Sequence, residues 1–392
     1  MNKNILKTGS QYFIKNNLNT DIMSVLLKKV DFEGVTAKEL VQQIEAKKKC
    51  REKLPTWFHA PKIYYPNKLN IEQTSSEITA QYKAEIINGK RVLDLTGGFG
   101  VDSLFFSKKV GMIFHCEIDR NLSEIATHNF KILGAKNIRT YPGNGIDFLT
   151  ESDKEFDWIY IDPSRRNDAK GKVFLLTDCL PNVPENLELL FRKSSHLLIK
   201  TSPLLDFSVG IKALQFVKEI HVVALRNEVK ELLWILEKGY KESISIKTVN
   251  LVKSGRETFS FSFSEEKEGY TVLSKPLNYL YEPNTAILKS GAFKTVANRY
   301  KVKKLHNNTH LYTSTFLIDF PGRRFEIAAV IPYRKKIVRK LAIQKANITV
   351  RNFKESVATI RKQFKIKDGG DIYLFFTKDL HGNYVVLKCL KI

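Results

Sequence analysis

The sequence predicts an α/β protein in which a doubly wound, mainly parallel sheet follows an N-terminal helical region and precedes a C-terminal α+β domain. From about residue 90 to 240, apolar strand-like runs alternate with helical stretches, as parallel strands joined by crossover helices do. Residues 91–102 run from a short apolar strand through a glycine-rich turn into a helix. From residue 324 onward, the order strand, helix, strand, helix, strand, strand indicates a separate C-terminal domain.

Residues 1–68 are expected to be helical and polar and to end in an extended connector. Thr36 and Glu39 have the spacing of a capping box, ahead of a helix through Lys49. Prolines and aromatic residues mark the connector: Pro55, Trp57, Phe58, Pro61, Tyr64, Tyr65 and Pro66. We expect these rings to dock the connector onto a domain; the alternative is that they meet a nucleobase.

The turn after the first strand is the strongest signal for a binding site. Its glycines, which permit positive φ and close approach of the backbone to a ligand, are Gly97, Gly98 and Gly100. A second apolar strand over residues 112–117 ends in Glu117, about twenty residues after the turn, where a carboxylate accepts ribose hydroxyls. Together they predict a site for an adenosine-type cofactor; the alternative is that Glu117 only faces solvent.

The turn departs from Gly-x-Gly-x-x-Gly and opens with Asp94-Leu-Thr-Gly-Gly-Phe-Gly, which resembles motif I of the class I S-adenosylmethionine-dependent methyltransferases. With the Asp162-Pro-Ser-Arg-Arg loop and the C-terminal tail, the whole chain resembles the members of this class that end in a THUMP-like domain. The resemblance implies a Rossmann-like sheet and S-adenosyl-L-methionine as cofactor. It also implies that Asp94 lies near the methionine end and that Thr96 belongs to the cofactor turn.

Further cofactor contacts follow from the same resemblance. Residues 137–141 resemble the third strand of the family, and the polar loop after it meets the adenine ring, with Asn144 as the expected contact and Asp147 as the expected helix cap. The segment before motif I often closes over the cofactor in such enzymes. Gln73 and Thr79 are therefore candidate cofactor neighbours, with simple helix capping as the alternative.

The expected reaction loop follows the strand at residues 156–161, because ligands in open α/β sheets bind at the carboxyl ends of strands. By resemblance, its candidate catalytic residues are Asp162, Pro163, Ser164 and Arg165, with Asp162 orienting the acceptor beside the cofactor. Methyltransferases of base amino groups have a second proline and an aromatic residue at the third and fourth positions. Their replacement by serine and arginine weakens the case for methylation of an amino nitrogen.

Two adjacent arginines close the same loop. Arg165 and Arg166 suit forked recognition of a phosphate or carboxylate, and the alternative is internal pairing with Asp168 and Asp178. Cys179 is expected to be a buried structural thiol rather than a nucleophile.

A fifth strand over residues 195–200 brings Lys200 and Thr201 to the same edge as site candidates, and Asp206 is expected to begin the next helix. The sixth and seventh strands are expected at residues 221–226 and 231–236, the seventh antiparallel.

The charge of the chain points to a polyanionic partner. There are 64 Lys and Arg against 41 Asp and Glu, a net charge of +23. The segment from residue 333 to 367 contains twelve basic residues and a single acid, Glu355. The basic residues are Arg334, Lys335, Lys336, Arg339, Lys340, Lys345, Arg351, Lys354, Arg361, Lys362, Lys365 and Lys367. This clustering favours RNA bound by residues 321–392 over a merely solvated face, and THUMP domains dock structured RNA.

Four regions are expected: a helical region and connector at 1–68, a methyltransferase domain at 69–265, a small ferredoxin-like or helical linking unit at 266–320, and a THUMP-like domain at 321–392. The sequence has no run of eighteen apolar residues and no secretory signal, so no membrane partner is expected. Its four cysteines form no Cys-x-x-Cys pair, which favours the cytoplasm and argues against a metal site.

The sequence therefore predicts an S-adenosylmethionine-dependent methyltransferase acting on structured RNA such as tRNA or rRNA. Two alternatives stay open: a methyltransferase for a protein or small molecule, and a non-catalytic RNA-binding protein that retains the fold. The sequence leaves the modified nucleotide and the oligomeric state undetermined.

Overall fold

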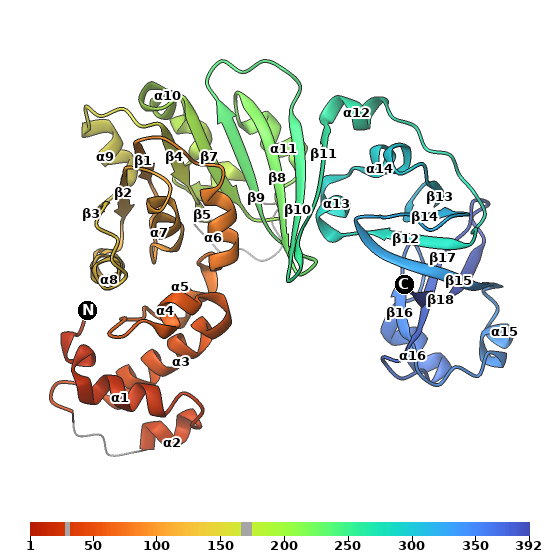
Figure 1. Ribbon diagram of the computed structural model, residues 1–392, viewed down its shortest axis with the longest axis horizontal. Coiled ribbons are helices and arrows are strands. Elements are labelled where there is room, and N and C mark those ends of the chain that lie inside the picture. The colour runs from red at the N-terminus through yellow and green to blue at the C-terminus, as the bar shows by residue number, and fades with distance from the viewer. Residues whose placement is uncertain (28–31, 166–174) are drawn as a thin grey trace. The chain divides into compact units, whose positions relative to one another are not determined.

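The computed structural model describes residues 1–27, 32–165 and 175–392. Its internal contacts divide the chain into two compact units. The first comprises Met1–Lys218 and Leu232–Lys241, and the second comprises Glu219–Glu231 and Glu242–Ile392. The predicted mixed α/β architecture is confirmed in both units (Figure 1). Within the described residues, no helix is long and apolar enough to cross a membrane.

The first unit begins with short helices. These are η1 (Lys3–Leu6), α1 (Thr8–Asn16), α2 (Ile22–Leu27), α3 (Ala37–Lys53), α4 (Pro55–His59), α5 (Lys68–Gln73) and α6 (Glu77–Ala84). The predicted capping box of Thr36 and Glu39 starts α3. Trp57 and Tyr65 are buried, and the Tyr64 backbone N–H donates to Asn129 Oδ1 at 3.0 Å. The connector aromatics therefore dock the chain onto the domain, as expected.

A nine-stranded sheet has the order β11-β10-β8-β9-β7-β4-β1-β2-β3. Its first strands are β1 (Arg91–Asp94), β2 (Met112–Glu117), β3 (Ile138–Pro142), β4 (Trp158–Ile161), β7 (His196–Thr201), β8 (Val217–Leu225) and β9 (Glu228–Glu237). Strands β1, β2, β3, β4 and β7 are parallel, and β9 is antiparallel to β7, as predicted for the seventh strand. The connecting helices are α7 (Val101–Ser107), α8 (Arg120–Ile132), α9 (Gly145–Glu151), α10 (Val183–Lys193) and α11 (Phe207–Ala213).

Two strands that were not predicted from the sequence extend this sheet. Strand β10 (Ser245–Val252) runs parallel to β8, and β11 (Gly255–Ser262) returns antiparallel to β10. Phe259 and Phe261 are buried and alternate with polar residues, the period of a strand with one buried face. The hairpin turn contains Gly255 at a φ of 136°. The signal was therefore present as alternation around a glycine turn.

The second unit contains a seven-stranded sheet in the order β13-β14-β12-β15-β18-β17-β16 (Figure 1). Its strands are β12 (Tyr279–Pro283), β13 (Lys303–His306), β14 (Thr309–Ser314), β15 (Gly322–Pro332), β16 (Asn347–Val350), β17 (Ile372–Lys378) and β18 (Tyr384–Lys391). Its helices are α12 (Phe263–Glu268), α13 (Thr285–Ser290), α14 (Phe293–Arg299), α15 (Lys335–Lys340) and α16 (Val357–Phe364). The predicted order of elements after residue 324 is confirmed.

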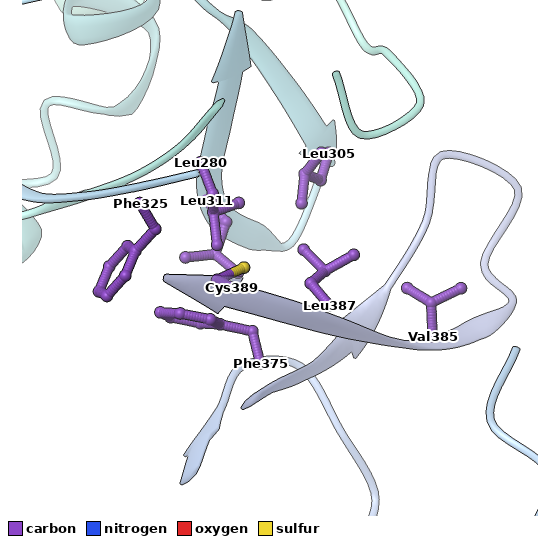
Figure 2. Close-up of a cluster of buried hydrophobic side chains, with 8 residues drawn as sticks. All are labelled: Leu280, Leu305, Leu311, Phe325, Phe375, Val385, Leu387 and Cys389. Atoms are coloured by element: carbon purple, nitrogen blue, oxygen red, sulfur yellow. The ribbon is translucent and has the colours of Figure 1, made fainter. Parts of the chain in front are cut away.

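Both faces of the C-terminal strands are buried. Leu374 and Phe376 of β17 pack with Val338 of α15 and Ile360 of α16. Phe375, between them, belongs to the opposite cluster, as the period of two in a strand requires. Figure 2 shows this opposite cluster, formed by Leu280, Leu305, Leu311, Phe325, Phe375, Val385, Leu387 and Cys389. Strands β12 to β14 thus share a core with β15, β17 and β18.

Candidate active site

The glycine turn between β1 and α7 is shaped by close packing beneath it. A Cβ on Gly97 would lie 2.2 Å from His115 Nε2, and one on Gly100 would lie 2.3 Å from Phe130. Gly98 and Gly100 have positive φ of 56° and 83°. These three positions therefore require glycine. Because glycine has no side chain, the backbone of the turn stays open to a ligand.

Asp94, at the end of β1, is almost completely buried. Its carboxylate accepts a hydrogen bond from Ser103 Oγ at 2.6 Å and one from the Thr96 backbone N–H at 3.1 Å. Burial raises the pKa of Asp94 to about 7, against the lowering effect of these two donors. The carboxylate is therefore fixed in orientation and titrates near neutrality.

Glu117, at the end of β2, reaches the same turn. Its carboxylate accepts from the Gly98 N–H and the Asp119 N–H, each at 2.8 Å. Burial raises the pKa of Glu117, and the two N–H donors oppose this shift. The predicted pair of glycine turn and acid is thus brought together, with the acid held by backbone rather than facing bulk solvent.

The loop expected to carry the reaction is tied directly to the glycine turn. The Asp162 backbone N–H donates to Thr96 Oγ1 at 2.7 Å. The Asp162 carboxylate is ion-paired and hydrogen-bonded to Lys200, at the end of β7. Asp162 is one-third exposed and Lys200 is mostly buried. The carboxyl ends of three parallel strands, β1, β4 and β7, therefore converge at Asp162, as the rule for open α/β sheets predicts.

The rest of the reaction loop is only partly described. Pro163 is buried, and Ser164 is exposed. Ser164–Arg165 forms β5, which pairs with β6 (Cys179–Leu180). The Arg165 side chain, Arg166 and Asp168 lie outside the described residues. Cys179 is buried, as expected of a structural thiol.

The remaining predicted residues divide between exposed and structural positions. Asn144 caps α9 by accepting from the Ile146 N–H, so the cap expected at Asp147 was assigned to the wrong residue. Asn144 immediately precedes the first helical residue, Gly145, whereas Asp147 already lies inside the first turn. Gln73 is exposed at the end of α5, and Thr79 is buried with its N–H bonded to the cap Ser76.

Thr201, the last residue of β7, and Asp206, which follows the strand, have structural partners. Thr201 is buried and accepts a hydrogen bond from Trp234 Nε1 at 3.0 Å. Asp206 is the cap of α11, as expected.

A buried polar cluster behind the turn was not predicted from the sequence. Lys83 of α6 is fully buried and lies 3.2 Å from Asp102 Oδ1. The other oxygen of Asp102 accepts from Ser75 and Tyr160, each at 2.8 Å. The cluster joins α6, α7 and β4 behind the glycine turn. Lys83 lies between Gln81 and Glu85 in the sequence, where nothing distinguishes it from a solvated helix lysine.

Two family profiles match the second unit. Residues 279–321 match a ferredoxin-like domain, and residues 322–391 match a profile described as THUMP domain-like. A search among curated proteins finds no match.

Solved structures extend the similarity to the whole chain. A protein from Porphyromonas gingivalis W83 that was assigned as a methyltransferase is 33% identical, with a TM-score of 0.90 over 99% of this chain and 98% of that chain. An rRNA methylase from Streptococcus thermophilus is 15% identical over 41% of this chain and 94% of that chain, with a TM-score of 0.31. TrmK from M. capricolum, in complex with S-adenosyl-homocysteine, is 16% identical over 41% of this chain and 68% of that chain, with a TM-score of 0.33.

The last two similarities are too low to carry an argument. The first covers nearly the full length of both chains, and the THUMP-like match places the expected domain at the C-terminus. The chain belongs to the family of class I methyltransferases that end in a THUMP-like domain.

Proposed function

We propose that the protein transfers a methyl group from S-adenosyl-L-methionine to a nucleotide of structured RNA, such as tRNA or rRNA. The observation that carries this proposal is the hydrogen bond from Asp162 to Thr96, because it ties the reaction loop to the glycine turn. A cofactor on that turn and an acceptor at Asp162 would then be neighbours. Membership of a methyltransferase family supports the methyl transfer, and the THUMP-like domain supports RNA as the substrate.

The residues around the turn fit this cofactor. Glycines at positive φ leave room for a ligand against the backbone, and the hydrogen bond of Glu117 to the Gly98 N–H supports a role for this carboxylate in accepting the ribose hydroxyls. Asp94, which is buried, would act at the methionine end through the Thr96 backbone that it binds, and the exposed Asn144 would meet the adenine ring. When bound, the cofactor supplies a sulfonium methyl group that is already activated for attack.

The protein's own work is then mainly positioning. Asp162 and the backbone at Pro163 would orient the acceptor in line with the methyl group, next to the cofactor. Lys200 restrains the Asp162 carboxylate and balances its charge. Fixing both reactants in this way supplies most of the rate enhancement that such a transfer needs.

RNA is the favoured substrate because the C-terminal region presents unneutralised positive charge. Lys335, Lys336 and Lys340 of α15 are exposed, and the structure records no ion pair for them among the described residues. Arg165 and Arg166 would add phosphate contacts at the reaction loop.

The deciding experiment offers labelled S-adenosyl-L-methionine and total RNA from a strain lacking the gene, followed by nucleoside mass spectrometry. We expect one methylated nucleoside with the wild-type protein. Asp162→Ala should abolish transfer while calorimetry shows nearly unchanged cofactor affinity, and the exposed Asp153→Ala should behave as wild type.

Three outcomes would contradict the proposal. Full activity of Asp162→Ala would remove its role in orienting the acceptor. Label found only in protein or small molecules of a cell extract would redirect the proposal to those substrates, and binding of RNA without any transfer would indicate a non-catalytic protein.

A further inference from the structure

The first unit contains a cavity of about 700 Å³ between helix α8, strand β3 and the N-terminal residues. Its lining residues are Met1, Lys3, Arg120, Ser123, Glu124, Thr127, His128, Lys131, Thr140 and Pro142. None of Asp94, Glu117, Asn144 or Asp162 is among them. The cavity is therefore separate from the residues assigned to cofactor and acceptor.

The charge lining this cavity is mainly positive. Lys3, Arg120 and Lys131 are exposed, and the structure records no ion pair for them within the residues it describes. Glu124 is the only acid among the described lining residues. Arg120 and Lys131 lie eleven positions apart on α8, three helical turns, so they flank the cavity from the same face. Unpaired cations around a cavity favour an anionic ligand.

The uncharged lining indicates which anion fits. Hydroxyl side chains of Ser123, Thr127 and Thr140 line the cavity, and the Thr127 and Thr140 hydroxyls are hydrogen-bonded at 2.8 Å. Hydroxyls and basic side chains are the groups that contact phosphate and sugar. The described lining contains no Phe, Tyr or Trp ring on which a base could stack. His128 Nε2 is held at 2.9 Å from the Lys62 carbonyl oxygen.

We propose that this cavity binds the sugar–phosphate backbone of the RNA substrate, as a contact surface additional to the THUMP-like domain. The inference rests on the proposed function for its RNA ligand. The volume lies within the range of about 300–1,000 Å³ that holds a compact ligand, and therefore suits a nucleotide segment of the backbone. Because the contacts are to phosphate and sugar, this site would position RNA without reading its sequence.

The test compares two charge-reversal variants of the full-length protein. Arg120→Glu with Lys131→Glu alters the cavity, and Lys136→Glu with Arg139→Glu makes the same change in net charge at exposed residues that do not line it. Affinity for labelled tRNA and for labelled single-stranded RNA is measured by fluorescence anisotropy over a range of salt concentrations. On single-stranded RNA, the cavity variant should lose about 0.7 of log–log salt slope for each phosphate contact, hence about 1.4 in total.

The control should keep a slope close to wild type. Equal slopes and affinities for the two variants would overturn the proposal, since the cavity would then add only to the general field. The neutral pair Arg120→Gln with Lys131→Gln should show the same direction of change, which guards against misfolding of the reversed pair.

The outcomes separate this inference from the proposed function. A cavity variant that binds and methylates RNA like the control overturns only the cavity site. A wild-type protein that binds no RNA overturns both proposals.

Discussion

The glycine turn of the first unit and the helix α15 of the second use charged residues in opposite ways. Behind the turn, Lys83 is fully buried and paired with Asp102. On α15, Lys335 and Lys336 are exposed, with no ion pair recorded in the described part of the chain. Buried pairs hold geometry but cost desolvation, whereas exposed charges cost little and attract a polyanion from a distance. The first arrangement suits a rigid turn, and the second suits the capture of RNA that we propose.

The largest expected effect is on the buried pair. Lys83→Met should lower the free energy of unfolding by about 3–5 kcal/mol, because it leaves the Asp102 carboxylate buried without its cation. Urea denaturation of the two proteins at neutral pH measures the change.

A double variant provides the control for this prediction. Lys83→Met with Asp102→Asn removes both charges and should recover part of the loss. A single variant as stable as the wild type would show that the pair does not hold the turn.

The second prediction uses His115, which is buried beneath the turn with both ring nitrogens lacking a hydrogen-bond partner in the described structure. Burial lowers the pKa of His115 from 6.5 to about 4. Between pH 6.5 and 4, His115 therefore binds a proton in the unfolded chain but not in the folded chain. Folded stability should fall by up to about 1.4 kcal/mol per pH unit between pH 6.5 and 4.

Denaturation of wild type and His115→Gln at several pH values isolates this contribution. The variant should be less stable than the wild type at pH 7, but its stability should fall less as the pH is lowered. Asp94 works in the opposite direction in both proteins, since its raised pKa favours the folded state as the pH falls toward 4, so it cancels in the difference. Parallel pH curves would show that His115 is protonated equally in both states.

The third prediction concerns Glu117. Glu117→Ala should weaken binding of S-adenosyl-L-methionine by about 1.5–3 kcal/mol, the range for hydrogen bonds to a charged group, while the fold is retained. Calorimetry gives the affinity, and the exposed Glu155→Ala serves as the matched control. Unchanged affinity in folded Glu117→Ala would remove this residue from the cofactor site.

The sequence predicted the elements whose signal is local. An apolar strand, β1, leads into a turn whose tight backbone requires glycines, and Glu117 follows at the expected separation. After residue 324, strand and helix periods alternate within short segments, so β15 to β18 could be located closely.

The missed features depend on partners distant in the chain. The buried Lys83 amine is stabilised by contacts with Asp102 and Ser75 in the folded chain, and no local sequence pattern predicts these contacts. The pairing of Lys200 with Asp162 joins two strands that are neighbours in the sheet. Each residue was a site candidate alone, but their contact required the topology.

The smallest expected effect on stability lies on α15 and distinguishes the two uses of charge. Replacing Lys335, Lys336 and Lys340 by Gln should change the free energy of unfolding by no more than about 0.5 kcal/mol for each substitution, because these side chains are exposed. The same triple variant should bind RNA more weakly. On single strands, its log–log salt slope should be reduced by about 0.7 for each phosphate that a replaced lysine had neutralised.

These substitutions test RNA binding more sharply than deletion of residues 321–392 would. Deletion would strip β15 from β12 and expose the core residues Leu280 and Leu311, so weaker binding could reflect a disrupted fold. The control changes three exposed lysines elsewhere, Lys238, Lys241 and Lys253, to Gln. If both triple variants lose affinity equally, the lysines of α15 are ordinary solvated side chains without a specific role in RNA binding. A protein or small molecule then becomes the favoured substrate. If only the α15 variant loses affinity, with stability unchanged, the helix serves RNA capture alone.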